Sequence, residues 1–123
     1  VLLLTGMTHL GSDRWMKQPE YMEWIVEQGE SYNVGGYIAP GNDYEFLNNL
    51  RRLTDRDIWS PGFGRQVTLR GGELISIEEQ IDRWRKIVEP TNDHHGKIIV
   101  GSYIMNADDP RKNAEELYNI VKG

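Results

Sequence analysis

The chain contains the glycine-rich stretch Ser60-Pro61-Gly62-Phe63-Gly64-Arg65-Gln66, which follows a short strand-like run at Asp57–Trp59. A second apolar run, Ile98-Ile99-Val100, also ends in a glycine, Gly101. Glycine lets the backbone approach a ligand closely, and N–H groups after a strand end can bind phosphate oxygens. The loops after the last two strands of a (β/α)8 barrel form a phosphate site in this way. These two loops therefore predict a barrel segment with an anion site.

Short apolar runs alternate with longer amphipathic segments, which is typical of parallel βα units. The predicted strands are Val1–Thr5, Val34–Ile38, Asp57–Trp59 and Lys97–Gly101. The first and last strands lack apolar–polar alternation, which predicts burial on both faces. Each strand is followed by a predicted helix; these are Pro19–Gln28, ended by Gly29, and three helices that begin at Asn42, Ser76 and Asp109. Four such units predict half of an eight-stranded barrel, and a small open α/β sheet is the alternative.

Two of the predicted helix starts carry capping patterns. Ser76 with Glu79 forms a capping box, and Asn42 with Glu45 resembles one. Asp109 is followed by a proline, which is favoured at the first helical position. We therefore expect these three helix starts to be well defined.

The length of the chain limits it to one domain or part of one, at 123 residues. A complete (β/α)8 barrel needs roughly 200 residues or more. The chain opens on a core-like strand, Val1-Leu2-Leu3-Leu4, with no element before it. We therefore expect residues 1–123 to be the second half of a (β/α)8 barrel, with strands five to eight and the helices that follow them.

The composition narrows the possible partners. A net charge of -5 argues against a nucleic-acid surface, which is normally basic. The chain has no cysteine, which fits a reducing compartment, and we expect a cytoplasmic protein. No apolar run approaches the roughly 18 residues of a membrane span. The sequence therefore predicts no nucleic-acid partner and no membrane partner.

Few side chains outside the glycine loops suggest chemistry. Thr8 follows the first strand, where its hydroxyl suits the edge of a planar base or a turn cap. His9 is adjacent, but a lone loop histidine more often packs or faces solvent. Asp93-His94-His95 resembles a metal-binding fragment, yet it precedes a strand, and a solvated loop opposite the active face is the favoured interpretation. We therefore predict no metal and no catalytic residue in this chain.

Taken together, these residues resemble the orotidine 5'-phosphate decarboxylase family, particularly its archaeal members, over nearly the whole chain. Leu4–Gly11 resembles the segment after the family's fifth strand, and Tyr37–Pro40 resembles the sixth strand and its exit. Ser60–Gln66 with Gly71-Gly72 is similar to the signature S-P-G-V-G-x-Q-G-G, and Ile98–Gly101 to I-I-V-G-R. The order and spacing of the four blocks agree with the family.

The resemblance implies a dimeric (β/α)8-barrel enzyme that converts orotidylate to UMP and CO2 in pyrimidine biosynthesis, without a metal or organic cofactor. It implies that Thr8 hydrogen-bonds the pyrimidine, that Pro61 lines the base pocket, and that Gln66 reaches between phosphate and base. It also implies that the N–H groups of Gly101 and Ser102 hold the phosphate.

The sequence departs from the family in three ways. The family's catalytic Lys-Asp-Lys-Asp array belongs to earlier strands and, for one aspartate, to the neighbouring subunit, so we expect the isolated chain to be inactive. Ser102 stands where the family has an arginine, which removes a charge-assisted bidentate contact with phosphate. Val67–Arg70 are extra residues inside the phosphate loop. We hypothesise that Arg65 or Arg70 supplies the missing cation.

Two other functions fit the same residues. The chain could be a half-barrel that only binds a nucleotide or sugar phosphate, which the absent arginine favours. It could also be a structural half-barrel that pairs with itself, because four βα units leave open sheet edges. The expected partners are therefore a nucleotide and either an N-terminal half-barrel chain or a second copy.

Overall fold

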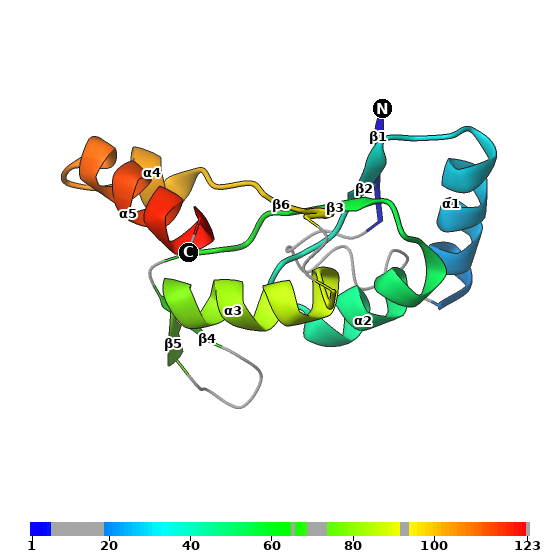
Figure 1. The fold of residues 1–123 in the computed structure, drawn as a ribbon, viewed down its shortest axis with the longest axis horizontal. Coiled ribbons are helices and arrows are strands. Elements are labelled where there is room, and N and C mark those ends of the chain that lie inside the picture. Colours follow the sequence, from blue (N-terminus) through cyan, green and yellow to red (C-terminus); the bar gives the residue numbers. More distant parts are fainter. Residues whose placement is uncertain (6–18, 65, 69–73, 92–93, 123) are drawn as a thin grey trace.

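A parallel four-stranded sheet organises the chain in the computed structural model, which describes residues 1–5, 19–64, 66–68, 74–91 and 94–122 (Figure 1). Its order is β1 (Leu2–Leu4), β2 (Gly36–Ile38), β3 (Asp57–Ser60) and β6 (Gly96–Ile98). The described helices are α1 (Pro19–Ser31), α2 (Tyr44–Leu53), α3 (Ile77–Val88), α4 (Ser102–Met105) and α5 (Pro110–Lys122). All three strand pairs are parallel, which confirms the predicted series of βα units. β6 ends before the predicted Gly101, because its partner β3 ends at Ser60, which is aligned with Ile98.

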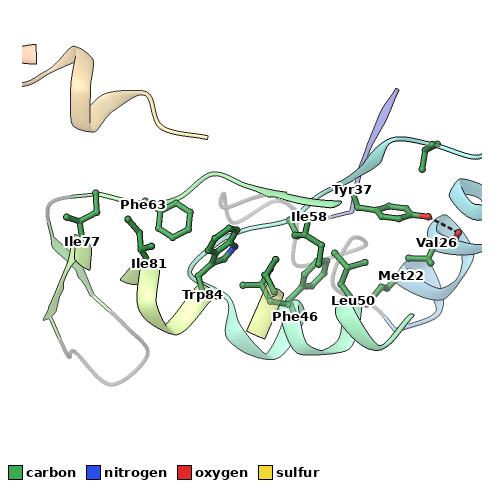
Figure 2. Packing of buried hydrophobic residues seen from close by; sticks show 14 of the residues in the cluster. Met22, Val26, Tyr37, Phe46, Leu50, Ile58, Phe63, Ile77, Ile81 and Trp84 are labelled. Carbon is green, nitrogen blue, oxygen red and sulfur yellow. Dashed lines mark hydrogen bonds between the residues drawn. The ribbon is translucent and has the colours of Figure 1, made fainter. Parts of the chain in front are cut away.

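The hydrophobic core lies on the face of the sheet that α2 and α3 cover (Figure 1). Leu3, Tyr37 and Ile58 are aligned on β1, β2 and β3; Tyr37 and Ile58 belong to this core, and Leu3 packs against it. Tyr37 and Ile58 are fully buried. Figure 2 shows the helix residues of the core, which include Phe46, Leu50, Ile81 and Trp84. The three- to four-residue spacing of apolar residues on α3 therefore marks its buried face, as predicted.

The opposite face of the sheet is open in the described part of the chain. Side chains alternate along a strand, so the aligned residues Leu4, Ile38 and Trp59 share this face. Within the described residues they are not members of the core cluster, and Leu4 is 37% exposed. Ile99, just beyond β6, is 39% exposed. The predicted burial of the first and last strands on both faces is therefore wrong for Leu4 and Ile99.

Helix α1 continues to Ser31, although Gly29 predicts its end. Gly29 instead lies against the ring of Tyr37, and a β-carbon there would stand 2.3 Å from the tyrosine hydroxyl oxygen. The same hydroxyl donates a hydrogen bond to the carbonyl of Val26 at 3.1 Å. Gly29 thus serves the close approach of a helix to a strand, and not a helix stop.

The predicted Ser76 cap is confirmed for α3, and the predicted cap of α2 is corrected. Ser76 Oγ accepts a hydrogen bond from the N–H of Glu79 at 3.2 Å, as the capping box predicts. α2 begins one residue later than expected, because Asp43 and not Asn42 caps it. The Asp43 carboxylate accepts the N–H of Phe46 at 3.2 Å.

A short hairpin interrupts the path from β3 to α3. Its strands, β4 (Gln66–Thr68) and β5 (Leu74–Ser76), pair antiparallel outside the main sheet. These two strands are not predicted from the sequence, because three residues are too few for alternation to be recognised. The extra residues Val67–Arg70 therefore begin within a strand of this hairpin.

Polar side chains attach α5 to the rest of the molecule. Arg85 on α3 donates to the carbonyl of Val121 at 2.6 Å, and Asn113 Nδ2 donates to the carbonyl of Tyr103 at 2.8 Å. Asp109 caps the helix by accepting the N–H of Lys112 at 3.1 Å, so α5 begins at Pro110 as predicted. Among the described helices, none combines the length and the apolar character needed to cross a membrane.

Candidate functional site

The two glycine-containing loops leave the same edge of the sheet. One loop, residues 61–64, follows β3, and the other, which contains Gly101, follows its parallel neighbour β6. The N–H of Ile99 donates to the carbonyl of Ser60 at 2.9 Å and so joins the two strand exits. The carboxyl ends of neighbouring parallel strands are where ligands bind in α/β folds.

A pocket of about 410 Å³ lies between these loops. Gly64 lines it from the first loop and Ser102 from the second. Asn106 and Asp108, which follow α4, also line the pocket, although neither is predicted from the sequence as a site residue. The pocket therefore joins both loops, but it also contains a carboxylate beside the position where the sequence predicts a phosphate.

The loop after β3 is fixed by packing and by a backbone contact. Gly62 adopts a φ of 98°, a conformation that glycine accepts without strain. Phe63 is buried and forms a T-shaped contact with Trp84, with ring centroids 5.7 Å apart. The N–H of Gly41, beyond β2, donates to the carbonyl of Pro61 at 2.8 Å. Three strand exits are thus held together at this edge.

The loop after β6 turns directly into α4. Gly101 is the N-cap of α4 and makes no side-chain capping bond. The first N–H groups of a helix have no partner within the helix. Both Gly101 and Ser102 are exposed, and a β-carbon on Gly101 would meet no atom within 4 Å. The local geometry therefore offers N–H donors on an open surface, which suits an anion.

The predicted site residues divide into two groups. Pro61, Gly101 and Ser102 lie at the same edge of the sheet, as expected from their loops. Thr8, Arg65 and Arg70 lie outside the described residues, so their roles stay predictions. Gln66 begins β4, and its side chain is also outside the described part of the chain.

Gln80, a polar residue on the buried face of α3, is not among the site residues predicted from the sequence. Gln80 is 2% exposed. Its Nε2 donates to the carbonyl of Gly64 at 2.8 Å, and its Oε1 accepts the N–H of Gly64 at 3.1 Å. Nε2 also donates to the carbonyl of Ile75 at 3.1 Å. One feature of the sequence could have indicated Gln80: it lies beside Ile81 in the apolar stripe of the helix, where polar residues are uncommon.

The histidine pair lies at the other end of the sheet. His94 and His95 precede β6, and His95 Nδ1 is 2.9 Å from a carboxylate oxygen of Asp57, the first residue of β3. This position confirms that the two histidines are remote from the pocket, whereas Asp93 is outside the described residues. Within the described ranges, no group of three or more His, Cys, Asp or Glu side chains could hold a metal ion.

Comparison with known proteins gives one consistent result, although no protein-family model matches the chain. The orotidine 5'-phosphate decarboxylase of Methanosphaera stadtmanae is 30% identical over 124 residues, which cover 99% of this chain and 48% of that protein. The decarboxylase of Thermoplasma acidophilum is 38% identical over 117 residues, which cover 95% and 45%.

Solved structures agree with these relatives. The orotidine 5'-phosphate decarboxylase of Pyrococcus horikoshii OT3 matches with a TM-score of 0.70 at 25% identity, over 99% of this chain and 50% of that one. The Methanocaldococcus jannaschii structure, a complex with the inhibitor BMP, matches the fold with a TM-score of 0.74 at 22% identity.

The matches extend along nearly all of this chain, but the chain spans about half the length of the curated relatives it matches. The same proportion holds for the solved structures, whose barrels it covers by half. The parallel βα series and the paired loops at one sheet edge fit this assignment. The chain therefore belongs to the orotidine 5'-phosphate decarboxylase family.

Proposed function

We propose that residues 1–123 form the carboxy-terminal half of an orotidine 5'-phosphate decarboxylase barrel and supply its pyrimidine and phosphate binding. One observation carries the proposal: Gly64 and Ser102, from the two strand exits, share one pocket in a chain of this family. In the reaction, the bond between C6 and the carboxylate of orotidylate breaks and CO2 leaves. The electron pair stays on C6, which takes up a proton to give UMP.

Each predicted site residue has one role in this proposal. The N–H groups of Gly101 and Ser102 bind the phosphate, and Pro61 lines the base pocket. Thr8 hydrogen-bonds the pyrimidine, and Gln66 reaches between base and phosphate. Because the phosphate is remote from C6, its binding energy positions and strains the reacting part of the substrate.

The missing charge at Ser102 makes a second cation part of the proposal. Within the described residues, the pocket contains the carboxylate of Asp108 and no basic side chain. A phosphate dianion there needs a positive partner, and Arg65 or Arg70 in the adjoining loop supplies it. Both lie outside the described residues, so their assignment rests on sequence position.

The open face of the sheet supports a completing partner. Leu4, Ile38 and Trp59 form an apolar row on this face, and a (β/α)8 barrel covers such a row with its remaining strands. A groove of about 740 Å³ runs beside β6 from Trp59 to Leu117, next to the strand edge that a further strand would extend. The proposed partner is an N-terminal half-barrel, which supplies the lysine that protonates C6 and the aspartates that destabilise the carboxylate.

The first experiment is the intact mass of every polypeptide in the purified sample. The second is a decarboxylation assay of this chain alone and mixed with the N-terminal half of the Thermoplasma acidophilum enzyme. We expect no turnover from either half alone and orotidylate-dependent UMP formation from the mixture. Turnover by this chain alone, at the rate of a whole enzyme, would show that the catalytic groups are misassigned.

A titration with UMP, and with uridine as the control that lacks phosphate, tests the binding role. We expect UMP to bind more tightly than uridine. UMP binding without activity in any mixture would instead indicate a half-barrel that only binds nucleotides. An eight-stranded homodimer without affinity for UMP would indicate a self-pairing structural unit and overturn the proposal.

A further inference from the structure

We propose that Gln80 is a positioning residue that fixes both ends of the loop in which the proposed phosphate cation, Arg65 or Arg70, lies. The identity of the ligand rests on the proposed function, whereas the contacts of Gln80 do not. The loop runs from Gly64, at the end of the β3 exit, to Ile75 in β5. It contains Arg65, Gln66 and Arg70.

The carboxamide of Gln80 meets the backbone at both ends of this loop. It holds Gly64 by two hydrogen bonds, one to the carbonyl at 2.8 Å and one from the N–H at 3.1 Å. Its second donated bond, at 3.1 Å, goes to the carbonyl of Ile75. A carboxamide has two N–H donors and one acceptor oxygen, so every polar atom of this side chain is used.

Gln80 connects the two ends of the loop to the hydrophobic core. It sits on α3 between Ile77 and Trp84, both of which are buried in the core cluster. Gly64 is 16 residues away in sequence, whereas Ile75 is five. The contact to Gly64 is therefore long-range. It fixes the start of the loop relative to α3, the helix that directly follows the end of the loop.

The held backbone is part of the pocket. Gly64 lines the pocket together with Ser102, and a β-carbon at Gly64 would meet no atom within 4 Å. A shift of Gly64 would thus change the distance between the two loops that face the ligand. Buried polar groups require hydrogen-bond partners. An apolar side chain at position 80 would remove the partners of the N–H and carbonyl of Gly64, so the backbone there would have to shift to form other hydrogen bonds.

The test compares Gln80→Met with Gln80→Glu and a matched control. Methionine keeps the length of the side chain and removes all three hydrogen bonds. Glutamate keeps the shape and the acceptor of the side chain but loses both N–H donors. Gln80→Glu replaces Gln80→Met as the test variant if the methionine variant does not fold. Val88→Ala is the control, because Val88 is fully buried on the same helix and is not a partner of Gly64.

The readouts are hydrogen exchange of residues 64–75 and affinity for UMP. We expect Gln80→Met to speed exchange in this segment about tenfold more than in α2, and to weaken UMP binding about tenfold, the effect of one lost hydrogen bond. Val88→Ala should lower the melting temperature without either local change.

Two results would overturn the proposal. One is equal exchange of residues 64–75 in Gln80→Met and Val88→Ala, which would mean that Gln80 contributes only to global stability. The other is faster local exchange with unchanged UMP affinity, which would mean that the held loop does not position the ligand. If the unaltered chain does not bind UMP, the proposed function fails, and exchange alone decides whether Gln80 positions the loop.

Discussion

Gly29 and Tyr37 lie in such close contact that any side chain on the glycine would overlap the tyrosine ring. A β-carbon on Gly29 would be 2.3 Å from the hydroxyl oxygen and 2.7 Å from two ring carbons. The tyrosine is held in place by full burial and by its hydrogen bond to the carbonyl of Val26. This pair therefore sets the distance between α1 and β2.

Replacing Gly29 with alanine should destabilise the chain by up to about 2 kcal/mol. Alanine normally stabilises a helix interior relative to glycine by about 1 kcal/mol, but an overpacked core costs about 1–3 kcal/mol, and here the contact is too close to relax cheaply. Urea unfolding measures the difference. Ser31→Ala, at the exposed end of the same helix, is the control, and a Gly29→Ala variant as stable as the unaltered chain would contradict the prediction.

Glu30 should make the stability of the chain depend on pH in the acid range. Burial raises the pKa of its carboxyl, but hydrogen bonds from Thr54 and Arg56 and the charge of Arg56 outweigh burial, so the pKa lies below its ordinary value of 4.5. A carboxyl with a lowered pKa stabilises the fold above its unfolded-state pKa. That contribution is lost as the pH falls through the folded-state pKa.

The measurement is the free energy of unfolding as a function of pH, for the unaltered chain and for Glu30→Gln. We expect the unaltered chain to lose stability below about pH 4.5 and the variant to lose less over the same range. The effect is modest, because the side chain of Glu30 is 36% exposed. Glu116→Gln, on the exposed surface of α5, is the control. Parallel curves for Glu30→Gln and the unaltered chain would refute the assignment.

Introducing arginine at Ser102 should strengthen UMP binding about tenfold or more. The guanidinium would add a charge-assisted bidentate contact to the phosphate, and hydrogen bonds to charged groups contribute about 1.5–3 kcal/mol. Uridine affinity should not change. Ser31→Arg adds the same charge far from the pocket and controls for long-range attraction. Equal gains for UMP and uridine would show that position 102 does not face the phosphate.

Removing Arg65 or Arg70 should weaken UMP binding if, as proposed, one of them supplies the cation that Ser102 lacks. We expect one of the two variants, Arg65→Ala or Arg70→Ala, to bind UMP about tenfold more weakly at low salt. The loss should shrink at high salt, where exposed charges are screened. Calorimetric titration at two ionic strengths measures it. Unchanged affinity in both variants would eliminate the loop arginines as phosphate ligands.

Trp59 should mediate association with the N-terminal half-barrel. It lies on the open face of the sheet, where Trp59→Ala would remove a large apolar contact worth about 2–4 kcal/mol in an interface. Titration of one half with the other, followed by sedimentation, measures the affinity. Trp24→Ala is the matched control, because Trp24 is 55% exposed on α1. If both variants associate like the unaltered chain, the partner does not cover this face.

The order of the βα units could be predicted because it depends on local patterns. Apolar runs such as Leu2–Leu4, glycines after strands, and the capping box at Ser76 each act over a few residues. That the two glycine-containing loops lie at the same edge of the sheet could be predicted, because the strands before them are parallel. Open and covered faces could not be predicted, because Leu4 and Leu3 look equally apolar in sequence and differ only in what packs against them.

The rest of the site depends on contacts that leave no local pattern. Gln80 and Gly64 are 16 residues apart, and a glutamine predicts neither its partner nor its burial. Asp108 enters the pocket through the path of the chain after α4, which the sequence did not indicate. The role of Gly29 could not be predicted either, because both a helix end and a close contact between elements favour glycine.

The hydrogen bonds of Gln80 also affect how many residues this loop can hold. Gly64 and Ile75 are both bonded to the same side chain, so the ends of the loop stay in place whatever lies between them. For a flexible loop with fixed ends, doubling the length costs only about 0.6 kcal/mol. Residues added between the two strands of the β4–β5 hairpin would therefore leave the sheet and its helices in place. New ligand preferences can arise at this point of the barrel without a new fold.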